Sequence, residues 1–246
     1  MSELSRYLDA DTTFKLGVMA SDTFPPIPVD AAFLHGRAHG DDTNLLEHTA
    51  LMHKLRVTPT IVLIGNEGQK FNDNVLQGAN PGMSYYRNRL EGLGVPPEDI
   101  HHITDVASER HTRGESLGFI RLAKQENWKS AVFPTQPHQS WRALAGTISA
   151  MTEVDYTIQA FYVTPFFTSW QEVTAGSQGQ DTKPRESHFE NEGDRIPPYT
   201  IKGDIATPVQ VLEYLKWREQ MVQNTLSRIS SSKETDLFYQ TILRAL

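Results

Sequence analysis

Short apolar runs alternate with longer helix-like segments along the first two thirds of this chain. Each run has the length and the β-branched or aromatic side chains that are typical of a strand. Because the segments between the runs are long enough to hold helices, they favour right-handed crossovers between parallel strands. The alternation therefore predicts an α/β fold: a doubly wound, mostly parallel sheet of Rossmann-like, three-layer architecture with C-terminal helices. The five predicted strands cover residues 30–34, 60–64, 99–103, 130–133 and 156–163.

Capping residues indicate where several helices begin. Asn44 precedes Glu47 at the spacing of a capping box, and Thr112 precedes Glu115 at the same spacing. We expect both pairs to satisfy free backbone N–H groups in the first turn of a helix. A further helix is predicted to begin at Pro137, directly after the fourth strand.

The length places all residues, 1–246, in one α/β domain. Residues 171–200 have few large apolar side chains and many Gly, Pro, Gln, Asp and Glu residues, which predicts an irregular surface excursion. A lid or substrate loop is the alternative for that segment. Helices are predicted to follow within 207–246, one starting at Thr207-Pro208 and one near Asp236.

Composition disfavours several classes of function. The formal net charge is −7, whereas nucleic-acid binding is normally indicated by a basic face. The chain has no cysteine, which excludes disulfides, a thiolate nucleophile and a thiolate metal site. No stretch approaches the ~20 apolar residues that a membrane span needs. We therefore expect a soluble cytoplasmic protein with a small-molecule ligand and no nucleic-acid or membrane partner.

The segment 130–142 gives the most specific indication of function. The fourth strand leads to Thr135, and the helix predicted to begin at Pro137 carries His138 and Arg142. Free backbone N–H groups and the positive end of the helix macrodipole favour an anion at such a junction. We therefore expect Thr135, His138 and Arg142 to surround a phosphate or a carboxylate.

Other candidate residues follow the remaining strands, because ligands of an open parallel sheet bind at the carboxyl ends of its strands. Arg37 and Arg113 can each clamp an oxyanion with the planar fork of a guanidinium group. Asn66 can contact polar groups of a ligand, and Glu67 is a candidate general base. The predicted catalytic residues are His138 and Glu67, and the predicted ligand-binding residues are Arg37, Asn66, Thr112, Arg113, Thr135 and Arg142.

Most of these candidates have a structural alternative. Arg142 can form an ion pair, Thr112 can be a helix cap, and Glu67 can be a solvated loop acid. His35 and His39 are four residues apart, but they follow a strand rather than lie on a helix, and no third ligand is spaced with them. We therefore predict no metal site.

Five short motifs follow one another between residues 28 and 165: Gly36-Arg37, a Gly-bounded loop at 65–68, Gly94-Val95-Pro96 with Ile100, His111-Thr112-Arg113-Gly114-Glu115, and Thr135-Gln136-Pro137-His138 with Arg142-Ala143. Their order and spacing resemble the YdcF-like family, a domain of largely unknown function that includes SanA and ElyC. The resemblance implies a doubly wound core over residues 28–165 with a site at its strand ends. It also implies S-adenosylmethionine as a candidate cofactor, because binding of that molecule has been associated with YdcF.

Together these residues predict an enzyme that acts by transfer or hydrolysis on a phosphate-bearing or nucleotide-like small molecule. A non-catalytic binding protein or sensor for a nucleotide or S-adenosylmethionine is the alternative, since it needs the same pocket without a proton-transferring group. A scaffold with a vestigial pocket is a third interpretation.

Overall fold

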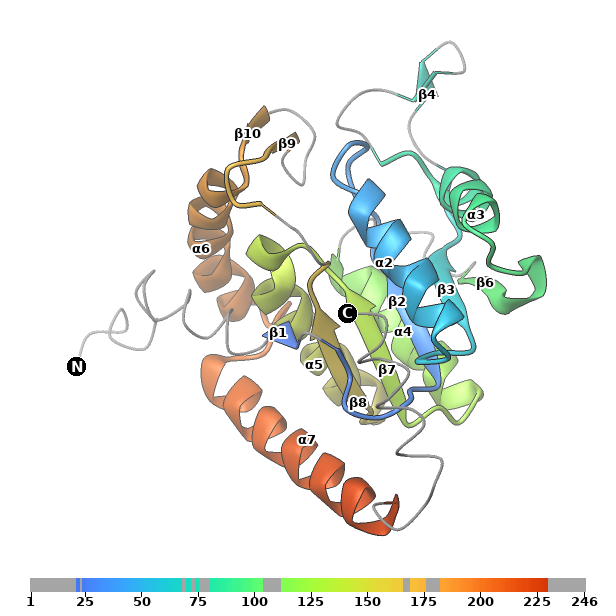
Figure 1. Ribbon diagram of the computed structural model, residues 1–246. Coiled ribbons are helices and arrows are strands. Elements are labelled where there is room, and N and C mark those ends of the chain that lie inside the picture. The colour runs from blue at the N-terminus through green and yellow to red at the C-terminus, as the bar shows by residue number, and fades with distance from the viewer. Residues whose placement is uncertain are drawn as a thin grey trace.

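A parallel sheet forms the centre of the molecule (Figure 1). The computed structural model describes residues 21–22, 24–67, 70–71, 74–75, 80–103, 112–165, 169–175 and 182–229. The sheet has the strand order β1-β8-β7-β2-β3-β6, and every neighbouring pair is parallel. Its five longer strands have the order 3-2-1-4-5 by position in the chain, which confirms the predicted doubly wound α/β fold. The strands are β1 (Ser21–Asp22), β2 (Ala31–Leu34), β3 (Ile61–Ile64), β6 (Ile100–Ile103), β7 (Ser130–Pro134) and β8 (Gln159–Val163).

Helices cover both faces of this sheet. α2 (Thr43–Lys54) and α3 (Met83–Gly92) pack on one face, and α4 (Thr112–Gln125) and α5 (Ser140–Val154) pack on the other. α7 (Pro208–Ile229) packs against β8 and contributes side chains to the hydrophobic clusters of both faces. The three predicted layers are therefore present, as is the predicted helix that follows Thr207.

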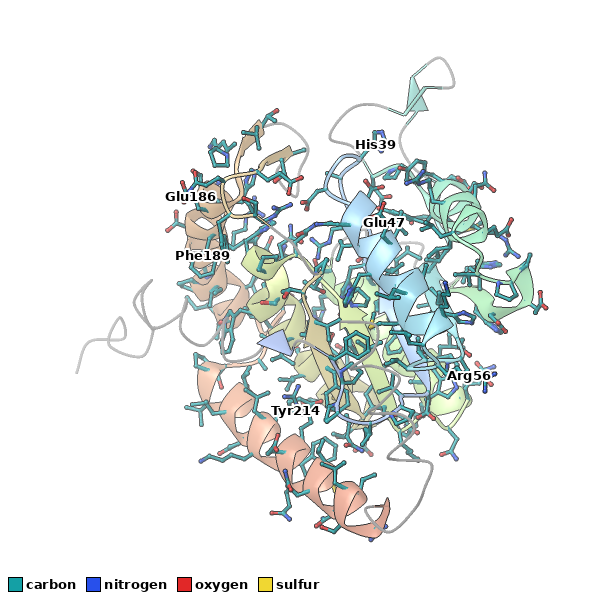
Figure 2. The ribbon with its side chains drawn as sticks, in the orientation of Figure 1. His39, Glu47, Arg56, Glu186, Phe189 and Tyr214 are labelled. Atoms are coloured by element: carbon teal, nitrogen blue, oxygen red, sulfur yellow. The ribbon has the colours of Figure 1, made fainter. Side chains whose placement is uncertain are left out.

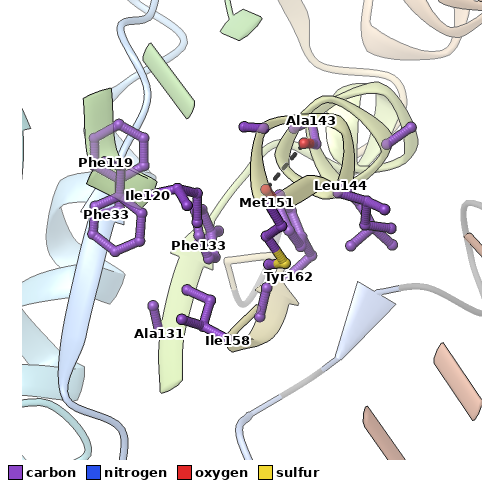
Figure 3. Close-up of a cluster of buried hydrophobic side chains, with 14 of the residues drawn as sticks. Phe33, Phe119, Ile120, Ala131, Phe133, Ala143, Leu144, Met151, Ile158 and Tyr162 are labelled. Atoms are coloured by element: carbon purple, nitrogen blue, oxygen red, sulfur yellow. Dashed lines mark hydrogen bonds between the residues drawn. The ribbon is translucent and has the colours of Figure 1, made fainter. Parts of the chain in front are cut away.

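Alternate side chains of the central strands enter opposite layers, as the pleat of a strand requires. Phe33 and Phe133 lie in the cluster under α4 and α5, whereas Val132 lies in the cluster under α2 and α3. Phe133 stacks on Tyr162, with 4.7 Å between ring centroids, and the Tyr162 hydroxyl donates a hydrogen bond to the carbonyl of Ala143 (Figure 3). This packing fixes where the carboxyl ends of β2 and β7 lie relative to the hydrophobic core.

The described residues of the segment 171–200, namely 171–175 and 182–200, lie mostly in strands and a helix, which corrects the predicted irregular excursion. β9 (Val173–Ala175) pairs antiparallel with β10 (Thr182–Pro184), and α6 (Arg185–Lys202) follows without a break. Gly193 and the pair Pro197-Pro198 lie inside α6, and both residue types disfavour a helix interior. The buried stripe of α6 has the spacing of a helix face but is mostly polar: Arg185, His188, Glu192 and Ile196.

Two predicted helix starts differ from the structure. Asn44 lies inside α2, whose N-cap is Asp42, and its side-chain oxygen accepts a hydrogen bond from Gln136 Nε2. The helix predicted to begin at Pro137 starts instead with a 3-10 turn over Pro137–Gln139, and the α-helix α5 begins at Ser140. The Asn44 side chain is thus bonded to the loop after β7 and does not cap its own helix.

The remaining elements are short and lie near the strand ends. β4 (Lys70–Phe71) and β5 (Asn74–Val75) pair as an antiparallel ribbon, and a 3-10 turn over Pro97–Asp99 precedes β6. The helix predicted near Asp236 lies outside the described residues. Within the described part of the chain, none of the helices combines the length and the hydrophobicity of a membrane span.

Candidate functional site

The strand order reverses between β2 and β7, which are direct neighbours in the sheet. The loops that leave these two strands diverge, and the crevice between them is where doubly wound folds bind ligands. The loop after β2 carries His35 and Arg37, and the loop after β7 carries Thr135 and His138. All four side chains are buried, with at most 8% exposed. Three of the predicted site residues are thus brought together with His35.

These two loops contain buried polar atoms that have no hydrogen-bond partner in the described part of the chain. Seven such atoms belong to residues 35–37 and 135–139: His35 Nε2, Arg37 Nε, Thr135 Oγ1, Gln136 Oε1, His138 Nδ1 and Nε2, and Gln139 Oε1. A buried polar group without a partner costs roughly 1–3 kcal/mol, and native proteins have few of them. Their concentration at the switch point indicates a place where a polar ligand completes the hydrogen bonding.

Glu115 of α4 holds the loop after β2 from the face of the sheet that α4 and α5 cover. Glu115 Oε2 lies 3.1 Å from His35 Nδ1 and accepts a hydrogen bond of 3.3 Å from the backbone N–H of Gly36. Glu115 therefore serves the site and not the predicted capping box. A Cβ at position 36 would lie 2.3 Å from Asn80 Nδ2 and 3.1 Å from Glu115 Oε1, so a larger residue there would displace these two side chains.

The same loop is held from the other face by Tyr86 of α3. The Tyr86 hydroxyl accepts a hydrogen bond from the backbone N–H of Arg37 (2.8 Å) and donates one to its carbonyl (2.9 Å). This double contact fixes the backbone of Arg37 and does not engage its guanidinium group. Burial lowers the pKa of the Arg37 guanidinium from its ordinary value.

Arg37 has negative neighbours but no ion pair within the described part of the chain, where no carboxylate lies within 4.0 Å of its guanidinium nitrogens. The largest offsetting charge is that of Asp41. Asp41 itself is buried, which raises its pKa to about 6, although Arg37 and Arg185 act against this shift. Arg185 Nη2 donates to Asp41 Oδ1 at 3.3 Å, so Asp41 is already engaged.

α6 supplies a wall of the site that the sequence did not predict. It packs against the 3-10 turn that carries His138, and the His188 ring lies 5.7 Å from the His138 ring between centroids. Arg185 bonds to the carbonyl of Ser169 and to Glu172 as well as to Asp41. Glu186, by contrast, lies on the exposed side of α6, as Figure 2 shows.

His138 lies among positive charges. Burial is the largest effect on its ring and pushes its pKa well below the ordinary value. The charges that add to this shift come from Arg37, His188, Arg185 and Arg142. His138 is therefore neutral at neutral pH and offers one N–H donor and one nitrogen acceptor.

Arg142 is engaged within the protein, in the ion pair that the sequence left open as the alternative to ligand binding. Its guanidinium forms a bidentate contact with Glu192 of α6, and its Nη1 donates to Thr112 Oγ1 at 2.8 Å. Burial would lower the pKa of Arg142, but Glu192 outweighs that effect and raises it. The structural alternative, an ion pair, is the observed one, and Thr112 serves this pair.

Three other predicted residues are not placed in the cluster. Arg113 donates to Glu153 at 2.6 Å and lies 3.8 Å from Asp204. Glu67 is exposed and accepts a hydrogen bond from Ser84 of α3, so it does not have the buried environment of a tuned base. Asn66 is in contact with α3 through its carbonyl, which accepts the Met83 N–H.

A sequence match to a nucleophile elbow is also resolved by the structure. Gly114-Glu115-Ser116-Leu117-Gly118 has the Gly-x-Ser-x-Gly form, which in serine hydrolases lies on a sharp turn between a strand and a helix. Here it lies inside α4, and the buried Ser116 Oγ is hydrogen-bonded to Thr147 Oγ1 at 3.0 Å. Ser116 is therefore a packing residue in this fold.

The described residues contain no group of three or more His, Cys, Asp or Glu side chains arranged to hold a metal ion. His35 turns to Glu115, and His39 Nδ1 lies 4.0 Å from Asp42. The two histidines that the sequence spaces four apart thus have different partners.

Comparison of this chain with models of protein families, with curated proteins and with solved structures finds no match. The assignment of the site therefore depends on its own geometry.

Proposed function

We propose that this protein binds a phosphate-bearing or nucleotide-like small molecule at the switch point between β2 and β7, and that it catalyses transfer or hydrolysis there. The ligand's phosphate would lie between the loops that carry Arg37 and His138. The observation that carries the proposal is the buried Arg37 guanidinium, which has no carboxylate within ion-pair distance in the described part of the chain.

A buried guanidinium group without an ion pair favours an anionic guest, because the guest would offset the desolvation of the charge. The Thr135 hydroxyl and the neutral His138 ring add donors beside it. Guanidinium, hydroxyl and imidazole donors together match the oxygens of a phosphate group. A carboxylate could use the same donors, but it has fewer oxygens to bond them.

The acceptors of the site indicate what the rest of the ligand carries. Gln136 Nε2 is fixed by the carbonyl of Asp41 and by Asn44, so its Oε1 is presented as an acceptor. Gln139 Oε1 is likewise buried without a partner. Acceptors need donors, so the ligand is expected to carry hydroxyl or amino groups as well as phosphate, as nucleotides and phosphorylated sugars do.

The same charges distinguish a phosphate-bearing ligand from S-adenosylmethionine, the cofactor that the YdcF-like resemblance implies. Arg37, Arg142 and Arg185 all raise the positive potential at His138. A sulfonium cation would be repelled there, whereas a phosphate would be attracted. We therefore favour a phosphate-bearing ligand over S-adenosylmethionine, and we keep membership of the YdcF-like family as a proposal.

A non-catalytic sensor is the second candidate. It is favoured by α6, which covers the site through ion pairs such as Arg142 with Glu192, because a ligand-dependent change in these pairs could be transmitted to a partner. The two candidates differ only in whether the bound molecule is changed.

The test is a thermal-shift screen of the wild-type protein against inorganic phosphate, nucleoside monophosphates, sugar phosphates and S-adenosylmethionine. A ligand that binds the folded state stabilises it increasingly as its concentration exceeds the dissociation constant. We expect phosphorylated compounds to raise the melting temperature and S-adenosylmethionine not to do so. Mass analysis of each stabilising compound after incubation separates an enzyme from a sensor.

The matched variants are Arg37→Gln and Arg113→Gln. Both remove one guanidinium group, but Arg113 is paired with Glu153 and lies outside the cluster. Arg37→Gln should lose the ligand-dependent shift, and Arg113→Gln should keep it. An unchanged shift in Arg37→Gln, or no shift of the wild type by any phosphorylated compound, contradicts the proposal.

A further inference from the structure

We propose that His35 is the catalytic base of this site and that Glu115 is its positioning residue, through the contact of 3.1 Å between His35 Nδ1 and Glu115 Oε2. The inference rests on the proposed function, because the proton that His35 would accept belongs to the water or hydroxyl group that attacks the bound phosphate. His138 is then assigned to ligand binding.

The contact with Glu115 determines which nitrogen of His35 can accept a proton. A carboxylate only accepts hydrogen bonds, so the neutral ring must carry its proton on Nδ1. The lone pair is then on Nε2, which is buried and has no hydrogen-bond partner among the described residues. An acceptor nitrogen is thus presented next to the loop that carries Arg37.

The orientation of the ring is fixed on its flat sides as well as at its edge. Phe33 packs edge-on against the His35 ring, with 4.8 Å between centroids and 69° between planes. Phe133 lies 6.1 Å away with its plane within 29° of the His35 plane. Together with Glu115, these contacts hold Nε2 in one direction. A general base needs such a fixed orientation toward the group from which it accepts a proton.

The charged groups around His35 come from three elements. Glu115 of α4 stabilises the protonated ring, whereas Arg37 of its own loop and Arg142 of α5 oppose protonation. Burial is the largest effect, and the pKa of His35 is lowered from its ordinary value. The ring is therefore unprotonated at neutral pH and ready to accept a proton, while Glu115 stabilises the imidazolium that forms.

His138 and Glu67 are less suited to the role. The main effects on the His138 ring all lower its pKa, and neither of its nitrogens has a hydrogen-bond partner among the described residues that would fix the ring. Glu67 is exposed and bonded to Ser84. Among these three residues, the His–carboxylate pair occurs only at His35.

The step conserves atoms and charge. His35 Nε2 accepts the proton of the attacking water or hydroxyl group as its oxygen forms a bond to phosphorus. The bond between phosphorus and the leaving oxygen breaks with its electron pair on that oxygen, which takes the proton back from the imidazolium of His35. The ring ends in its starting form, and no other reactant is needed.

The first measurement is the titration of ¹⁵N-labelled histidines by NMR, with the His35 signals assigned from their loss in His35→Gln. In the wild type we expect the Nδ1–H form of the ring. Glu115→Gln keeps an oxygen acceptor but removes the charge, so the pKa of His35 should fall. A purely structural Glu115 would leave this pKa unchanged, and that result, or a wild-type ring protonated on Nε2, overturns the inference.

The second measurement is kinetic, with p-nitrophenyl phosphate and each nucleotide that stabilises the protein as substrates. His35→Gln should lower kcat by about 100-fold or more, the contribution typical of a general base. His138→Gln should act mainly on KM. His53→Gln is the matched control, because His53 is paired with Asp99 at 3.0 Å but lies at the far end of α2, near the labelled Arg56 of Figure 2.

Binding of inorganic phosphate, measured by calorimetry, separates the two proposals. If phosphate binds to the wild type and to His35→Gln alike while kcat is lost, both proposals stand. If phosphate binds but His35→Gln retains the wild-type kcat, or the wild type turns over no phosphate ester, the assignment of His35 is overturned and the anion site remains. If phosphate does not bind to the wild type, the proposed function fails and the assignment of a base fails with it.

Discussion

The central sheet and α6 both border the candidate site, but different forces hold them. The sheet buries mostly aromatic and aliphatic side chains, with Phe133 stacked on Tyr162 and edge-on to Phe33 and Phe119. α6 is attached through ion pairs, in which Arg185 contacts Asp41 and Glu172, and Glu192 contacts Arg142. The comparison teaches that apolar burial sets the fold of this chain, while buried charge shapes the cover of its site.

The largest effect should come from the apolar region. Phe133→Ala removes a fully buried ring that contacts Tyr162 and Phe119, and the free energy of unfolding should fall by roughly 3 to 5 kcal/mol. Urea denaturation measures the loss. Leu93→Ala is the control, because Leu93 is 41% exposed and its removal should cost less than about 1 kcal/mol. Equal losses in the two variants would contradict the division into regions.

The next largest effect on stability should come from His48, a buried histidine of α2. Burial lowers the pKa of His48 from 6.5 to about 4, so the folded state excludes a proton that the unfolded state binds. The free energy of unfolding is therefore unaffected by His48 above pH 6.5 and falls as the pH drops from 6.5 to about 4, by about 3 kcal/mol in total.

The variant His48→Leu isolates this effect. Asp41 acts in the opposite direction over an overlapping range, since its pKa is raised to about 6. Protonation of Asp41 therefore restores stability as the pH falls, and only the difference between wild type and variant reports on His48. Urea denaturation at several pH values measures the free energy of unfolding of both proteins. Relative to the wild type, the free energy of unfolding of the variant should rise as the pH falls from 6.5 to about 4. Parallel curves would rule out the role of His48.

A smaller effect, confined to α6, is expected from the charged region. Glu192→Gln leaves the largely buried Arg142 without its bidentate partner, and local protection should fall by roughly 2 kcal/mol. Hydrogen exchange should accelerate in residues 185–202 but not in β7. Glu153→Gln removes an exposed partner of Arg113 and should change little. Loss of protection in the sheet as well would mean that α6 and the core unfold together.

The smallest effect on stability should come from the loop between the two regions. Gly36→Ala places a methyl group against Asn80 and Glu115 and should cost about 1 kcal/mol as these side chains move. Because Glu115 moves, the NMR titration should show a clear change in the pKa of His35 even though the loss of stability is small. Gly92→Ala is the control, since a Cβ there meets nothing within 4 Å and a helix favours alanine. A His35 titration identical to that of the wild type would show that the loop absorbs the methyl group.

The sequence predicted the sheet because its signal is local. Each central strand is a continuous apolar run, and the observed bounds differ from the predicted ones by only a few residues. The strand-end rule also predicted that Arg37, Thr135 and His138 share one edge of the sheet, and the structure places all three in the loops that follow β2 and β7. Periodicity could not find α6, since its buried face reads Arg185, His188, Glu192 and resembles a solvated face.

The roles within the site were less accessible to prediction. Arg142 has the position of an anion clamp, but its partner Glu192 is 50 residues away, and pairing at such distance leaves no pattern in the sequence. Glu115 has the spacing of a cap and is instead bonded to His35 across 80 residues. The signal in the sequence that could have indicated the His35–Glu115 pair is the histidine directly after β2, in His35-Gly36-Arg37.

The polar stripe of α6 has a consequence for the behaviour of the protein at high concentration. If α6 swings out to admit a ligand, the surface it uncovers consists mainly of guanidinium, imidazole and carboxylate groups, which water solvates readily. A cover attached by leucines would expose an apolar patch each time it opened, and such patches promote association between molecules. A cover attached mainly through charged and polar side chains would therefore expose little apolar surface on opening.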